Sequence, residues 1–162
     1  MFSGRYPIVG IIGEGDCGEE LYRTAEEVGG LVARHGAAVV CGGLGGVMEA
    51  ACRGAVNEGG ITIGFLPGGL KSDANPFVTI ALPTGMGEAR NVLVVRSADA
   101  IIAVGGKYGT LSEIALALKL GTPLVGLQTW ELSREGQRVD AFPVRQTPAE
   151  AVSLAFGLMD QR

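Results

Sequence analysis

The sequence has few of the side chains that most enzymes use for acid–base or metal chemistry. Its 162 residues include one histidine, His35, and three cysteines, Cys17, Cys41 and Cys52. The cysteines form no C-x-x-C pair and no histidine neighbours a candidate nucleophile, so we expect neither a metal site nor a hydrolase triad. His35 follows a predicted helix, where a histidine has a structural role. Three cysteines without framework spacing favour a reducing, cytoplasmic location.

Long apolar runs and an excess of positive charge are also missing. No apolar stretch reaches the length of a membrane span, and there is no leader-like N-terminus. Lys and Arg number 13 against 17 Asp and Glu, which gives a net charge of −4. We therefore expect no nucleic-acid or membrane partner held by bulk charge. A small anionic ligand needs only a local site and stays possible.

Glycine and short apolar runs are abundant instead, with 27 glycines and 47% hydrophobic residues. Buried strands are predicted at 7–12, 38–41, 61–66, 77–82, 100–103 and 122–127, and helices at 19–34, 47–57, 88–97, 114–120 and 147–159. Residues 128–140 are polar and are interpreted as a surface loop. The alternation predicts one Rossmann-like, doubly wound α/β domain over residues 1–162, with a mainly parallel sheet covered by helices on both faces.

Glycine-rich turns follow several of these strands. Turns at Gly13, Gly42, Pro67, Thr84 and Gly105 should meet at one edge of the sheet, where such folds bind ligands. Residues 13–18 match G-x-G-x-x-G, but the second strand ends in glycines where a dinucleotide site needs an acidic residue. The sequence therefore does not favour NAD, and we expect no resident cofactor.

Residues 104–113, VGGKYGTLSE, form the turn on which the chain is centred. They join a buried strand to a helix, and a helix N-terminus after glycines binds anions, most often phosphate. Thr110 and Glu113 fit a capping box, with Thr110 as the N-cap. Glu113 would then lie in the first turn and stay ionised, able to stabilise a cation. Tyr108 either stacks on a base or fills the turn.

Three segments together carry a family resemblance. Residues 105–113 resemble the PGGxGTxxE motif of the LOG ("lonely guy") family, residues 42–49 resemble its second glycine loop, and residues 85–91 lie where that family has an Arg-Lys pair. The resemblance implies Rossmann-like dimers that cleave the N-glycosidic bond of nucleoside 5′-monophosphates. It also implies a catalytic pair, Arg90 and Glu113.

The same resemblance implies a set of residues around a phosphate-bearing, nucleotide-like ligand. The phosphate loop would be Gly105, Gly106, Gly109 and Thr110. The other turns at the predicted cleft, independently of the resemblance, add the candidate ligand contacts Gly13, Gly15, Gly42, Gly43, Gly45, Gly46, Met48, Glu49 and Tyr108. From the sequence alone, Glu49 is equally a helix cap or a ribose contact.

Two departures separate the chain from the LOG motif. Val104 replaces the proline of the motif, and Asn91 replaces the lysine after the arginine. The chain also resembles the subgroup that contains molybdenum-cofactor carrier proteins. The leading hypothesis is a nucleoside monophosphate phosphoribohydrolase, and the alternative is a non-catalytic carrier or sensor of a phosphate-bearing ligand. A lysine decarboxylase, the label often attached to this family, is disfavoured because no lysine has a pyridoxal-phosphate context.

A homo-oligomer, at least a dimer, is also predicted. The LOG resemblance implies it, and the helix 47–57 has small and apolar residues on more than one side. Such a helix has to be buried on more than one side, either against a second copy or within the chain.

Overall fold

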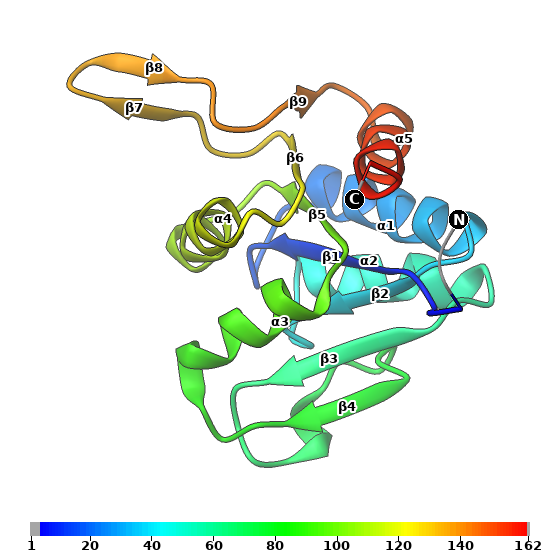
Figure 1. The fold of residues 1–162 in the computed structure, drawn as a ribbon. Coiled ribbons are helices and arrows are strands. Elements are labelled where there is room, and N and C mark those ends of the chain that lie inside the picture. The colour runs from blue at the N-terminus through cyan, green and yellow to red at the C-terminus, as the bar shows by residue number, and fades with distance from the viewer. Residues whose placement is uncertain (1–3, 162) are drawn as a thin grey trace.

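A seven-stranded parallel sheet forms the centre of the protein. The computed structural model describes residues 4–161. The sheet strands are β1 (Ile8–Gly13), β2 (Ala38–Cys41), β3 (Thr62–Leu66), β4 (Ile80–Pro83), β5 (Ala100–Val104), β6 (Leu124–Leu127) and β9 (Val144–Arg145). Their order is β4-β3-β2-β1-β5-β6-β9 (Figure 1). The strand order reverses between β1 and β5, which are direct neighbours. A parallel sheet binds ligands at such a point, beyond the carboxyl ends of its strands.

Five α-helices cover the two faces of the sheet. They are α1 (Glu19–Arg34), α2 (Val47–Asn57), α3 (Asn91–Ser97), α4 (Tyr108–Leu120) and α5 (Pro148–Met159), with short 3-10 turns η1 (Lys71–Asp73) and η2 (Gly87–Arg90). One apolar cluster joins α1, α2 and α5 to the sheet, and a second joins α3 and α4 to it. The predicted Rossmann-like α/β fold is therefore confirmed.

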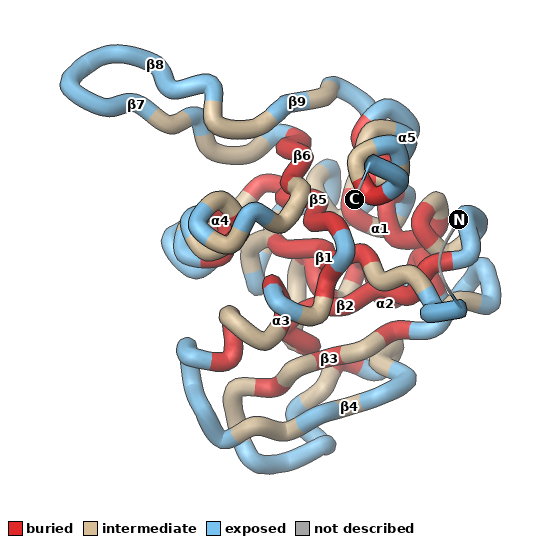
Figure 2. Tube along the Cα trace, in the orientation of Figure 1, coloured by how far each residue is buried: buried red, intermediate tan, exposed pale blue. Residues whose placement is uncertain are grey.

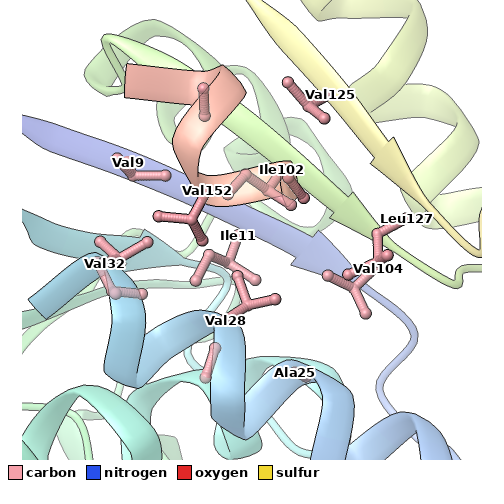
Figure 3. Close-up of a cluster of buried hydrophobic side chains, with 14 of the residues drawn as sticks. Val9, Ile11, Ala25, Val28, Val32, Ile102, Val104, Val125, Leu127 and Val152 are labelled. Carbon is pink, nitrogen blue, oxygen red and sulfur yellow. The ribbon is translucent and has the colours of Figure 1, made fainter. Parts of the chain in front are cut away.

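Successive side chains of each central strand point to opposite faces of the sheet and therefore belong to different clusters. In β1, Val9 and Ile11 belong to the cluster under α1, α2 and α5, whereas Ile12 belongs to the cluster under α3 and α4. Figure 3 shows the first cluster, with Val28 of α1 and Val152 of α5 directed at the strands. Burial is concentrated on the central strands and falls toward β4, whose Ile80 is exposed (Figure 2). The ends of β1 and β5 thus stand on a rigid, fully packed base.

Glycines allow α1 and α2 to pack very closely. A Cβ atom on Gly29 would overlap the carbonyl oxygen of Ala51, and one on Gly54 would overlap that of Glu26. The small residues of α2 therefore serve contacts within the chain, with Ala50, Ala51 and Ala55 buried. This burial accounts for the composition of the helix, and the predicted homo-oligomer stays a prediction.

Three segments differ from the sequence expectations. Residues 77–79 are not strand, because Asn75 folds them into a turn by accepting from the backbone N–H of Phe77 and Val78. The helix predicted at 88–97 is divided into η2 and α3. Residues 128–140 contain a hairpin, β7 (Leu132–Arg134) with β8 (Gln137–Val139), which extends away from the body (Figure 1). Glu135 and Gly136 have positive φ, as a two-residue hairpin turn requires.

No helix within residues 4–161 is long and apolar enough to cross a membrane.

Candidate functional site

The loops after β1, β2 and β5 meet at the carboxyl edge of the sheet. Gly13 at the end of β1 is in register with Val104 at the end of β5, so the residues that follow these strands lie side by side. The loop after β2 joins them, because the backbone N–H of Val47 donates to the carbonyl of Glu14 at 3.0 Å. Three of the five predicted turns therefore build one site, whereas those at Pro67 and Thr84 lead the chain toward Arg90.

A hollow of about 210 Å³ opens between these loops. Its lining residues are Gly13, Glu14, Gly15, Leu44, Met48, Glu88, Arg90, Asn91, Gly109, Thr110 and Glu113. Seven of these were candidates from the sequence, namely Gly13, Gly15, Met48, Arg90, Gly109, Thr110 and Glu113. A hollow of this size encloses a phosphate with its neighbouring groups and not a whole nucleotide. A larger ligand has to extend over the mouth.

The turn that precedes α4 is formed by glycines with positive φ. Gly105 has φ of +58° and Gly106 has φ of +117°, a conformation that other residues rarely adopt. A Cβ atom on Gly106 would also lie 2.5 Å from the Cβ of Thr110. The turn leads into α4. The N-cap residue of this helix is Lys107, and no side chain makes a capping hydrogen bond there. The first N–H groups of α4 are therefore available to an anion.

The predicted capping box of Thr110 and Glu113 is wrong. The helix begins at Tyr108, so Thr110 is its third residue and Glu113 lies one turn further in. Lys107 takes the N-cap position with extended backbone. Glycine at 106 permits this early start, which the spacing of Thr110 and Glu113 did not reveal.

Glu113 is buried in the wall of the hollow and is only 7% exposed. Burial raises its pKa to about 8, against the opposing charge of Arg90 and with a further contribution from Glu88. The carboxyl group makes no hydrogen bond with another residue of the described chain. The expectation that the helix dipole keeps Glu113 ionised is therefore wrong, since the dipole acts only within the first turn and burial dominates. At neutral pH the carboxyl group is mostly protonated.

Arg90 is held in the opposite wall by main-chain carbonyls. Its Nε donates to the carbonyl of Phe65 at 2.8 Å and its Nη2 to that of Gly42 at 3.4 Å. Its Nη1 donates to Asn91 Oδ1, and Asn91 in turn donates to Ser112 Oγ at 3.1 Å. Gly42 is needed here because a Cβ would lie 2.6 Å from Arg90 Nη2. The guanidinium is thus fixed in direction before any ligand arrives.

Glu14 is a site residue that sequence reasoning missed. Its Oε1 accepts a hydrogen bond from the backbone N–H of Gly106 at 3.1 Å, and its Oε2 lies 3.7 Å from Lys107 Nζ. The side chain is 17% exposed. In the sequence, Glu14 occupies a variable position of the G-x-G-x-x-G motif, and nothing in the motif marks it as a binding residue.

Several candidate residues lie outside the lining. Glu49 accepts a hydrogen bond from the Tyr22 hydroxyl at 3.1 Å. Tyr108 is 81% exposed and its ring lies beside Trp130, with the ring centroids 5.8 Å apart. Gly43, Gly45, Gly46, Gly105 and Gly106 shape the loops without lining the hollow.

His35 packs away from the site. It ends α1, its Nδ1 lies 2.8 Å from the carbonyl of Leu31, and its ring stacks on Phe156. Among residues 4–161, no group of three or more His, Cys, Asp or Glu could hold a metal ion.

The fold and the hollow define a Rossmann-like α/β protein that presents a glycine-rich ligand site at the carboxyl edge of its sheet. A model of the SLOG cluster4 family matches residues 6–152, and the chain belongs to this family. An uncharacterized protein of Archaeoglobus fulgidus is 49% identical over 146 residues, which are 90% of this chain and 91% of the relative.

Two similar solved structures are molybdenum-cofactor proteins. The molybdenum cofactor binding protein of Rippkaea orientalis is 33% identical, with a TM-score of 0.87 over 97% of this chain and 99% of that chain. The molybdenum cofactor carrier protein of Chlamydomonas reinhardtii is 34% identical, with a TM-score of 0.84 over 96% and 99% of the two chains. The similarity therefore extends over almost the full length of both.

Proposed function

We propose that this protein is a carrier that binds a phosphate-bearing, cofactor-like ligand of the molybdenum-cofactor type. The site offers an uncapped helix N-terminus behind a glycine turn, which suits a phosphate. The similarity to the two molybdenum-cofactor proteins supports the rest of the ligand's identity. In this proposal the phosphate lies on the Gly105–Thr110 turn, and the ligand body extends across Arg90 and Glu113 toward the mouth.

The burial of Glu113 in the wall of the hollow, where it is only 7% exposed, favours a carrier over a hydrolase. A glycosidic bond breaks with positive charge on the ribose, and an ionised carboxylate would be needed to stabilise it. With a pKa of about 8, Glu113 is mostly neutral at pH 7. A neutral carboxyl group can donate a hydrogen bond to a ligand, which suits binding without turnover.

A phosphoribohydrolase is the second candidate, favoured by Arg90 and Glu113 lining the same hollow. In this mechanism Arg90 would hold the substrate and Glu113 would act only when ionised. Hydrolysis would then increase with pH through about 8. Release of free base and ribose 5-phosphate from a panel of nucleoside monophosphates, measured near neutral pH and near pH 9, tests this candidate directly.

The carrier proposal is tested by loading. The purified protein is mixed with molybdenum cofactor released from a molybdoenzyme, separated from free cofactor, and measured for bound molybdenum and for pterin fluorescence after oxidation. We expect near-stoichiometric loading without release of free base from the monophosphates.

Gly106→Ala should abolish loading, because a side chain at φ of +117° deforms the turn. Gly157→Ala, in an open position on α5, is the matched control and should load normally. Turnover of a monophosphate, or failure of the folded protein to load, would refute the proposal.

A further inference from the structure

The turn that suits a phosphate already holds a carboxylate. The backbone N–H of Gly106 donates to Glu14 Oε1 at 3.1 Å, and the ammonium group of Lys107 lies 3.7 Å from Glu14 Oε2. A main-chain N–H at a glycine turn and a lysine beside it are the groups that bind phosphate in other proteins. Glu14 therefore makes, from inside the protein, the contacts that a ligand phosphate would make.

The position of Glu14 follows from the sheet. β1 and β5 are parallel neighbours whose last residues, Gly13 and Val104, are in register. The first residue after β1 is consequently opposite the first residues after β5. The carbonyl of Glu14 is anchored by the N–H of Val47, so its side chain is held over the turn. A Cβ on Gly105 would lie 2.9 Å from Glu14 Oε1, which shows how closely the carboxylate approaches the main chain.

We propose that Glu14 is the residue that determines which anions enter the site. Its carboxylate occupies the place at the Gly105–Lys107 turn where a phosphate would bind, and the ligand has to displace it. This inference rests on the proposed phosphate-binding function. Free inorganic phosphate gains only the contacts that Glu14 loses, so it binds weakly. A phosphate attached to a larger ligand gains the contacts of Arg90 and Glu113 as well, and it displaces the carboxylate. The carrier is thereby protected from filling with free phosphate.

The experiment measures inorganic phosphate binding to the ¹⁵N-labelled protein at constant ionic strength and pH 7.5. Wild type, Glu14→Ala and Asp16→Ala are compared by the dissociation constant and by the amide shift of Gly106. Asp16→Ala is the matched control, because Asp16 has the same charge and lies exposed in the same loop but does not line the hollow. Glu14→Gln is the second variant, which keeps an acceptor for the Gly106 N–H and removes only the charge.

Glu14→Ala should bind phosphate about tenfold or more tightly than wild type, since a charge-assisted competitor is gone. The Gly106 amide should shift on titration, Glu14→Gln should change in the same direction, and Asp16→Ala should stay within about threefold of wild type. Affinity unchanged in both Glu14 variants, an unmoved Gly106 amide, or an equal gain in Asp16→Ala would overturn the inference. Equal binding by wild type and Glu14→Ala at the amides of Gly109 and Thr110 would overturn it and leave the proposed function standing. No phosphate binding by any of the folded proteins would overturn both.

Discussion

The buried carboxyl group of Glu113 should make the stability of the protein fall as the pH rises. Its pKa in the folded protein is about 8, whereas its ordinary value is 4.5. Below pH 4.5 the group is protonated in both the folded and the unfolded protein, and it has no effect. Between pH 4.5 and 8 the unfolded chain has lost this proton and the folded protein keeps it. The folded state therefore loses stability over this interval, and above pH 8 the loss is complete.

The size of the effect follows from proton linkage. One proton held by the folded state alone costs about 1.4 kcal/mol for each pH unit, or about 5 kcal/mol over the whole interval. Glu113 is almost fully buried, so solvent screening reduces this figure little. A loss of even half this size is a large part of the stability of a domain of this length.

Glu113→Gln isolates the effect, because the amide has the same shape and does not titrate in this range. Urea unfolding of both proteins from about pH 5 to about pH 9 gives the difference in unfolding free energy, in which all other titrating groups cancel. We expect the unfolding free energy of the variant, relative to that of wild type, to increase steadily up to about pH 8 and to stay constant above it. Curves that stay parallel at all pH values would refute the assignment of a protonated Glu113.

Glu88→Gln provides a control on the cause. The charge of Glu88 contributes to raising the pKa of Glu113. Removing this charge should lower the pKa of Glu113, so the loss of unfolding free energy should end at a lower pH. The loss for each pH unit should stay the same. A shift to higher pH would contradict the electrostatic account.

Two further predictions concern packing and the fixed arginine. Gly54→Ala should reduce the unfolding free energy by about 2–3 kcal/mol, because the added Cβ overlaps the carbonyl of Glu26, whereas Gly157→Ala, with nothing within 4 Å, should increase it by about 0.5–1 kcal/mol. Equal effects in urea unfolding would contradict the close packing of α1 on α2. Arg90→Lys should cost about 2 kcal/mol or more, since a lysine cannot replace the three-way bonding of the buried guanidinium, and exposed Arg96→Lys should be nearly neutral. An Arg90→Lys protein as stable as wild type would show that the fork geometry is not needed.

The architecture of the protein follows from local patterns in its sequence. Apolar runs of strand length alternate with helical stripes, and glycines follow the strands, because each strand of a doubly wound sheet is buried on both faces and turns sharply into a helix. The same local signals located the glycine turn at 105–110, and the family resemblance selected Arg90 and Glu113 as a pair. They failed where a distant partner decides the local structure. Asn75, for example, is held by the carbonyls of Gly43 and Leu44, and in this position it turns residues 77–79 out of the sheet.

The chemistry of the site depends on contacts that form only when the chain is folded. The protonation of Glu113 depends on how much water the rest of the fold leaves around it, and no spacing in the sequence reports that. The direction of Arg90 is set by carbonyls of Phe65 and Gly42, which are 25 and 48 residues away. Glu14 reaches the N–H of Gly106 across 92 residues, because β1 and β5 are neighbours in the sheet although distant in the chain. Periodicity and motifs report the neighbours along the chain, whereas the charged groups around the hollow are brought together by neighbours in space.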